Sequence, residues 1–142
     1  MNLKKIAPEV FVSAQISPDD ARRAAAEGIK TIICNRPDQE AAGQPATQDI
    51  ENAAAEVGIE FVHIPVTPGS ITDECVSEFA AACDRSKGPI LAYCGSGMRA
   101  TCLWALAEAE SRDVDDILKS AQEAGFALTD LRPRLEARSP DR

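Results

Sequence analysis

The sequence predicts an α/β fold with a central, mainly parallel sheet of four or five strands flanked by helices. Short apolar runs, typical of buried strands, alternate with longer segments that begin at helix-capping residues and end near a glycine. Such alternation is typical of right-handed β–α–β units, in which helices cover both faces of a parallel sheet. Because the 142 residues contain no internal repeat, low-complexity segment or linker, we expect one domain over 1–142, with residues from about 139 to 142 frayed.

Four apolar runs are the candidate strands. Each contains branched aliphatic residues and is bounded by proline, glycine, asparagine or serine, which is the pattern of short strands in a buried sheet. The runs cover residues 10–14, 30–34, 60–66 and 89–93. The segments 35–45, 67–70 and 94–99, which follow the last three runs, contain glycine or proline and are expected to be loops. In a parallel sheet, ligands bind where such loops meet at the carboxyl ends of the strands.

The helices are predicted from their first residues. Ser17 is a typical N-cap, Pro18 suits the first helical position, and Asp19 and Asp20 suit the positive end of the helix dipole. Thr72 is the N-cap of a later helix by the same criterion. The expected helices cover 17–28, 47–57, 72–86, 100–110 and 113–124, and a last one starts near residue 129.

The charge balance bears on the class of partner. There are 15 lysine and arginine residues against 23 aspartate and glutamate residues, so the formal net charge is −8. A chain this acidic repels a phosphate backbone, and we do not expect a nucleic-acid partner. No apolar run approaches the roughly 20 residues that cross a bilayer. Residues 1–11 also lack a signal-like apolar stretch, so we expect no membrane partner and a cytoplasmic location.

The five cysteines are expected to be reduced thiols. Their number is odd, none lies in a Cys-x-x-Cys pair, and the chain holds a single histidine, His63. This set does not supply the ligands of a structural zinc site, so we expect no metal and no cofactor. An isolated cysteine at the end of a buried strand, such as Cys34, is most often a small apolar residue of the core.

The turn after the run 89–93 carries the candidate chemistry. It comprises Cys94, Gly95, Ser96, Gly97, Met98 and Arg99. Its glycines let successive backbone N–H groups point into one concavity, the following helix adds positive potential, and Arg99 adds a guanidinium fork that suits an oxyanion. The same conditions favour a thiolate over a thiol. The turn therefore predicts an anion-binding loop with Cys94 as an ionised nucleophile.

From about residue 10 to residue 135 the chain resembles a bacterial family of phosphatase-like domains. These domains are related to the N-terminal part of beta-lactamase-hydrolase-like proteins and are often labelled sulfur transferases. The resemblance rests on the segments FVSAQISPDD, KTIICNRPDQE, EFVHIPV, GPILAYCGSGMRA and AGFALTDLRPRL. It implies the fold of the dual-specificity phosphatases, with the anion-binding loop after the last parallel strand.

The resemblance leaves two reactions open, and the loop length favours sulfur transfer. Cysteine phosphatases are known for Cys-x5-Arg, whereas four residues separate Cys94 from Arg99, as in the Cys-x4-Arg loop of single-domain rhodaneses. In this hypothesis thiosulfate or a persulfide donor binds to Arg99 and the amides of residues 95–98. Cys94 takes the outer sulfur as a persulfide, and a thiol or cyanide then accepts it.

Phosphatase chemistry, the alternative with a phosphoester substrate, needs groups that the sequence does not clearly supply. A general acid usually lies in the loop after the preceding strand, here 66–70, which contains no carboxylate. Asp73 is the nearest candidate, although it follows Thr72 and suits the first turn of a helix. Ala100 stands where phosphatases have a hydroxyl after the arginine, and Thr101 could substitute for it. A non-catalytic anion or redox sensor is therefore a third hypothesis.

Two more residues could join the site. His63 would approach Cys94 if their two strands are neighbours, and is otherwise a residue of the sheet. Arg36 follows the run 30–34 and could add positive charge at the same edge, with Glu40 as its ion-pair partner, or it could serve only to anchor the loop. The sequence leaves the oligomeric state open.

Overall fold

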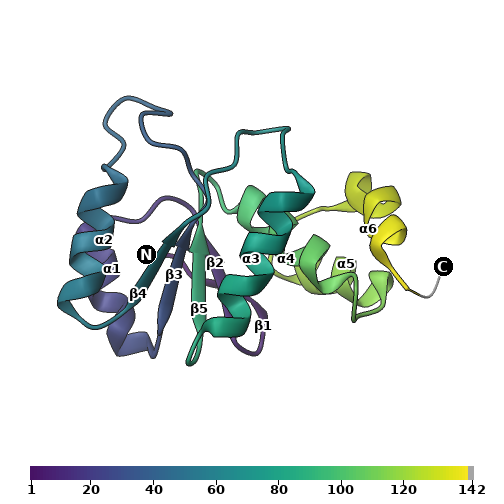
Figure 1. Cartoon of the computed structure of the whole chain (residues 1–142), viewed down its shortest axis with the longest axis horizontal. Coiled ribbons are helices and arrows are strands. Elements are labelled where there is room, and N and C mark those ends of the chain that lie inside the picture. Colours follow the sequence, from purple (N-terminus) through teal and green to yellow (C-terminus); the bar gives the residue numbers. More distant parts are fainter. Residues whose placement is uncertain (141–142) are drawn as a thin grey trace.

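The structure, a computed structural model, describes residues 1–140 and confirms the predicted α/β class (Figure 1). Its strands are β1 (Lys4–Ala7), β2 (Val10–Ser13), β3 (Thr31–Cys34), β4 (Glu60–His63) and β5 (Ile90–Tyr93). They form one sheet in the order β1-β2-β5-β3-β4. β1 is antiparallel to β2 and the other three neighbouring pairs are parallel, so the prediction of a mainly parallel sheet is confirmed.

The sequence pattern did not indicate the edge strand β1. Both of its lysines are exposed, and Ile6 is its one buried residue. A run with so few apolar residues has no strand-like pattern, and it becomes a strand because it pairs with β2 through a short turn. Lysines on an edge strand also discourage pairing with a second chain.

β4 is shorter than the predicted run 60–66. Regular pairing with β3 ends at His63. Pro65 has no N–H to donate to a ladder, yet the chain stays alongside β3, because the amides of Ile64 and Val66 donate to the carbonyls of Cys34 and Asn35 at 2.8 and 3.1 Å. This continuation brings the carbonyl of Val66 to the edge where the candidate loop lies.

The helices begin close to the predicted residues. Ser17 caps the first helix with a full capping box, in which its hydroxyl accepts from the amide of Asp20 and the Asp20 carboxylate accepts from the Ser17 amide. The helices are α1 (Pro18–Ala24), the 3₁₀ turn η1 (Ala25–Glu27), α2 (Thr47–Glu56), α3 (Asp73–Arg85), α4 (Met98–Glu108), α5 (Val114–Glu123), the 3₁₀ turn η2 (Thr129–Leu131) and α6 (Arg132–Arg138). Within residues 1–140, no helix is both long and apolar enough to cross a membrane.

Two boundaries at the ends of helices differ from the predictions. α4 starts at Met98 instead of residue 100, because Gly97 is its N-cap, so Met98 and Arg99 belong to its first turn. At the C-terminus the Ser139 amide still donates to the Glu136 carbonyl (3.2 Å). Of the predicted frayed segment 139–142, residues 141–142 lie outside the part that the structure describes.

Each face of the sheet has its own apolar core. Figure 1 shows α1 and α2 on one side of the sheet and α3 and α4 on the other, with α5 and α6 beyond α4. Alternate side chains of the central strands serve the two cores, so Ile32 and Leu91 pack with the residues of α1 and α2, whereas Ile33 and Ala92 pack with those of α3 and α4. The two central strands β3 and β5 are buried along their whole length.

The sheet register brings three loops to one edge. Tyr93, the last residue of β5, pairs with Ser13 at the end of β2 on one side and with Cys34 at the end of β3 on the other. The segments that follow these three residues therefore start side by side at the carboxyl ends of parallel strands. This is the position at which α/β proteins bind ligands.

Candidate active site

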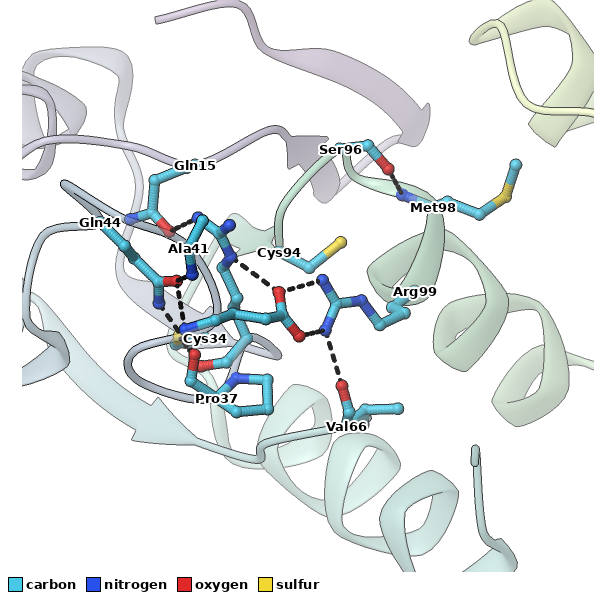
Figure 2. A network of polar contacts seen from close by, with 12 residues as sticks. Gln15, Cys34, Pro37, Ala41, Gln44, Val66, Cys94, Ser96, Met98 and Arg99 are labelled. Atoms are coloured by element: carbon cyan, nitrogen blue, oxygen red, sulfur yellow. Dashed lines mark hydrogen bonds and ion pairs between the residues drawn. The ribbon is translucent and has the colours of Figure 1, made fainter. Parts of the chain in front are cut away.

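The loop from Cys94 to Arg99 joins β5 to α4 at that edge. Cys94 is buried, and the amide of Gly97 donates to its sulfur at 3.1 Å. The Ser96 hydroxyl accepts from the amide of Met98 at 3.3 Å, as Figure 2 shows. The amides of Gly95 and Ser96 have no acceptor among residues 1–140. The loop thus offers one amide to the sulfur and two further amides to a ligand, next to the positive end of α4.

Gly97 is the position at which this loop needs a glycine. Its φ of 96° lies in the left-handed region, and a Cβ there would lie 3.0 Å from Cζ of Phe126 and 3.3 Å from the carbonyl oxygen of Ser13. That same oxygen accepts from the amide of Cys94 at 3.4 Å. The loop is therefore packed between the end of β2 and the segment that carries Phe126, and a side chain at residue 97 would require these neighbours to shift.

The Arg99 side chain is held by two acceptors on one end of its guanidinium group. Glu40 accepts from Nη1 at 2.7 Å and from Nη2 at 2.8 Å, and the carbonyl of Val66 accepts from Nη1 at 2.7 Å (Figure 2). These bonds use both protons of Nη1 and one proton of Nη2. The other edge, formed by Nε–H and the second Nη2 proton, makes no further hydrogen bond to residues 1–140 apart from an interaction with the Cys94 side chain. Arg99 is thus fixed in place while one bidentate edge stays available to an anion.

The pKa values follow from this pairing. The hydrogen bonds from Arg99, helped by those from Arg36, lower the pKa of Glu40 to about 2. In return the bond to Glu40, together with the nearby Cys94, raises the pKa of Arg99 above its ordinary value. Glu40 therefore stays ionised at any physiological pH. A carboxylate held in this way has no proton to give, so Glu40 cannot serve as a general acid.

Arg36 lies on the other side of Glu40. Its Nε donates to Glu40 at 2.9 Å, which confirms the predicted ion pair, and its Nη1 donates to the side chain of Gln15 at 3.0 Å. A Cβ built on Gly95 would lie 3.6 Å from Nε of Arg36 and 3.2 Å from Nη2 of Arg99. Both guanidinium groups therefore adjoin the first residue after the candidate nucleophile.

His63 does not reach this cluster. β3 lies between β4 and β5, so the strands that carry His63 and Cys94 are not neighbours, and the condition for a catalytic role is not met. The Nε2 atom of His63 is 3.0 Å from the carbonyl oxygen of Arg36, on an exposed side chain. His63 is a residue of the outer strand that supports the loop after β3.

Asp73 and Thr101 have structural partners instead of positions at the nucleophile. Asp73 is the first residue of α3 and accepts from Arg134 at 3.3 Å and from Arg138 at 3.2 Å. The hydroxyl of Thr101 donates to the carbonyl of Gly97 at 2.8 Å within the first turn of α4. Its proton is therefore directed at the Gly97 carbonyl and not at Cys94, and a role for Thr101 in place of the hydroxyl after the arginine stays a prediction.

The thiols of Cys34, Cys83 and Cys102 differ from that of Cys94 in their surroundings. Burial, with a smaller effect of Cys94, raises the pKa of Cys102 to about 11, and burial raises that of Cys83 to about 12. Burial also raises the pKa of Cys34, whose sulfur donates to the carbonyl of Arg36. These three thiols are neutral. The sulfur of Cys94 differs from them in its environment, because it accepts a hydrogen bond from the amide of Gly97.

The sequence analysis missed how Arg99 is held. It paired Glu40 with Arg36 alone, and it assigned no role to Gln15 or to the carbonyl of Val66. The signal available was that Gln15 and Glu40 lie in segments that follow predicted strands and that Val66 ends one, because such strand ends meet in a parallel sheet. The order of the strands was needed to bring them together.

We predict that Glu40→Gln lowers kcat/KM of the reaction at Cys94 about ten- to a hundredfold, because the Arg99 guanidinium loses its bidentate partner and is no longer held in one position. It should also lower the free energy of unfolding by an amount that depends on pH. Above the ordinary Glu pKa of 4.5 the carboxylate of the wild type is ionised in both folded and unfolded chains, so its advantage is complete. The advantage should shrink as the pH falls from 4.5 towards about 2.

Urea denaturation of both proteins at several pH values measures this difference. Glu51→Gln, the same substitution on the exposed face of α2, is the control and should behave as the wild type does. A Glu40→Gln deficit that is unchanged between pH 6 and pH 3 would contradict the ion-pair account.

We predict that Gly97→Ala is more costly than Gly125→Ala, although both glycines have positive φ (96° and 98°). A left-handed alanine costs about 1–2 kcal/mol at either position. Only at Gly97 does the added Cβ also meet neighbouring atoms, since nothing lies within 4 Å of the corresponding position at Gly125. Urea denaturation and phosphate-binding calorimetry compare the two. Equal losses of stability, with phosphate binding intact in both variants, would show that the loop tolerates a side chain at Gly97.

The family comparison agrees with the resemblance found in the sequence. A model of the phosphatase-like domain of beta-lactamase hydrolase-like proteins matches residues 2–111. The Beta-lactamase hydrolase-like protein of Agrobacterium fabrum is 31% identical over 98% of this chain and 33% of its own length. The protein of that name from Xylella fastidiosa is 33% identical over 76% of this chain and 25% of its own length. The chain thus spans a third or less of the curated relatives it matches.

Solved structures share the architecture. A candidate phosphatase from Neisseria meningitidis is 38% identical and has a TM-score of 0.86. The alignment covers 97% of this chain and 99% of that one. The core catalytic domain of the PP-IP phosphatase SIW14 from S. cerevisiae (16% identity, TM-score 0.74, 99% of this chain and 87% of that one) shows the same fold. Tk-PTP in its active form also shows this fold (17% identity, TM-score 0.74, 99% of this chain and 97% of that one). With its phosphatase-like fold and a family model that matches most of its length, the chain belongs to the family of phosphatase-like domains of beta-lactamase hydrolase-like proteins.

Proposed function

We propose that this chain is a cysteine-dependent phosphatase domain in which Cys94 is the nucleophile. The proposal rests above all on one observation. The sulfur of Cys94 accepts from the amide of Gly97, while the amides of Gly95 and Ser96 and the Nε–Nη2 edge of Arg99 are available to an oxyanion. The family match and the phosphatase neighbours support this reaction better than the sulfur transfer that the loop length had favoured.

The reaction would proceed in two steps. The phosphoryl oxygens bind to the loop amides and to Nε and Nη2 of Arg99, which places phosphorus beside the Cys94 sulfur. The sulfur attacks, the bond from phosphorus to the leaving-group oxygen breaks, and that oxygen takes the electron pair. A water molecule then attacks the phosphocysteine, which releases phosphate and returns the thiolate.

The carboxylates considered within residues 1–140 do not supply a proton donor, and this restricts the leaving group. No carboxylate lies in the loop 66–70, Glu40 is ionised, and Asp73 is occupied by two arginines of α6. An alkoxide would leave slowly without a proton. We therefore expect good turnover only where the leaving group is stable as an anion, as in aryl phosphates, acyl phosphates and phosphoanhydrides.

Sulfur transfer is kept as a second candidate because two observations favour it. The loop is one residue shorter than Cys-x5-Arg, and sulfite needs no proton to leave. In that reaction the Cys94 sulfur attacks the outer sulfur of thiosulfate, the S–S bond breaks, and sulfite departs with the electron pair. The resulting persulfide passes its sulfur to a thiol.

We predict that a series of aryl phosphates is hydrolysed faster as the pKa of the leaving phenol falls, and that Cys94→Ser lowers kcat/KM about a thousandfold or more. Cys102→Ser, which removes the nearby thiol of α4, should keep the activity and serves as the matched control. Phosphate release is the measurement. Rates that do not depend on the phenol would mean that a proton donor does operate at this site.

Intact mass after incubation with thiosulfate separates the candidates. If the protein gains the mass of one sulfur atom only when Cys94 is present, and no phosphate is released, the sulfurtransferase reaction is supported and the phosphatase proposal is wrong. If neither reaction depends on Cys94, the loop acts as an anion or redox sensor and the proposed function is wrong.

A further inference from the structure

We propose that Arg36 forms a second anion subsite beside the Cys94–Arg99 loop, so that the substrate carries two adjacent anionic groups, as a diphosphate does. This inference rests on the proposed function, because it assigns the reacting phosphoryl group to the loop. It goes further by naming the class of leaving group and the residue that recognises it.

The first argument is the set of donors that Arg36 leaves free. A guanidinium group has five N–H donors. Arg36 uses Nε for Glu40 and one proton of Nη1 for Gln15. The second Nη1 proton and both Nη2 protons have no acceptor within residues 1–140. The side chain is 14% exposed, and its Nη2 atom is not buried, so these donors remain open to solvent and to a ligand.

The second argument is position. The Nε and Cζ atoms of Arg36 lie 3.6 and 3.8 Å from the point where a Cβ of Gly95 would be, and Nη2 of Arg99 lies 3.2 Å from that point. Two guanidinium groups therefore lie next to Gly95, the first loop residue after Cys94. An anion held by Arg99 at Cys94 has Arg36 as its next cationic neighbour.

The third argument is charge. Glu40 is a single carboxylate shared by Arg36 and Arg99. The Glu40 side chain is 24% exposed, and those of Arg99 and Arg36 are 13% and 14% exposed. The three groups together keep one net positive charge in a chain whose formal charge is −8. A lone phosphoryl group could use the free edge of Arg99 and the loop amides, and it would leave the donors of Arg36 unused. A second anionic group bonded to the first would use them.

The same substrate class agrees with the missing proton donor. In a phosphoanhydride the leaving group is itself a phosphate, which departs as a stable anion. Arg36 would bind it and stabilise the charge that it gains as the P–O bond breaks. Recognition of the leaving group and the lack of a carboxylate acid are then two consequences of one arrangement.

The test measures binding in a background without turnover. In Cys94→Ser protein, calorimetry should show inorganic pyrophosphate binding about tenfold more tightly than inorganic phosphate. Adding Arg36→Gln should weaken pyrophosphate about tenfold and phosphate less than about threefold, as expected for loss of one charged group from one ligand. Arg36→Lys should retain part of the preference, since it keeps the charge without the planar fork.

Arg85→Gln is the matched control. It makes the same substitution and the same change of net charge at the exposed end of α3, five residues before β5 begins, whereas Cys94 follows the end of that strand. It should leave the affinities for pyrophosphate and phosphate unchanged. Thermal unfolding of every variant checks that the fold is intact.

Two results would overturn the inference. One is equal affinity of Cys94→Ser protein for pyrophosphate and phosphate. The other is an equal loss of affinity for pyrophosphate and for phosphate when Arg36→Gln is added. That result would mean that Arg36 only holds Glu40 and Arg99 in place. If aryl phosphate is still hydrolysed through Cys94 in these cases, the proposed function stands and only the subsite fails. If Cys94-dependent phosphate release is absent from every substrate, the proposed function itself fails.

Discussion

The bidentate ion pair between Glu40 and Arg99 is the interaction on which the site depends. Glu40 comes from the loop after β3, and Arg99 comes from the first turn of α4, so the pair joins segments that follow two neighbouring strands. The carbonyl of Val66, which follows β4, holds the same guanidinium. Three loops are thereby fixed around Cys94 by one side chain. Because the acceptors occupy one end of the guanidinium, its other edge stays available for an anion.

This arrangement also determines which chemistry the site can perform. A carboxylate that neutralises arginines is ionised, whereas a general acid must be protonated. Glu40 has the first role, because its pKa is lowered to about 2. The site can therefore stabilise developing negative charge with amides and cations, but its described groups do not protonate a leaving group. Phosphoanhydride cleavage and sulfane-sulfur transfer both fit this constraint, because the leaving group of each departs as a stable anion.

Local features of the sequence predicted local features of the structure. The alternation of apolar runs with capped helices predicted the α/β class, and Ser17 and Thr72 cap helices as expected. Cys94 and Arg99 could be proposed as site residues from the sequence because the loop that holds them is contiguous in the chain. Contacts between segments that follow different strands could not be predicted in the same way, because they depend on the order of the strands in the sheet. His63 was a candidate only if β4 and β5 were neighbours, and Glu40 reaches Arg99 because β3 and β5 are. β1 escaped notice because its pairing, not its apolar content, makes it a strand.

The most direct test of the account is a crystal structure of Cys94→Ser protein with bound phosphate or tungstate. The account predicts that the anion accepts from the amides of Gly95 and Ser96 and from Nε and Nη2 of Arg99, while Glu40 keeps its two bonds on the opposite end of that guanidinium. An anion that takes the place of Glu40 on Arg99, or that binds away from residue 94, would contradict it.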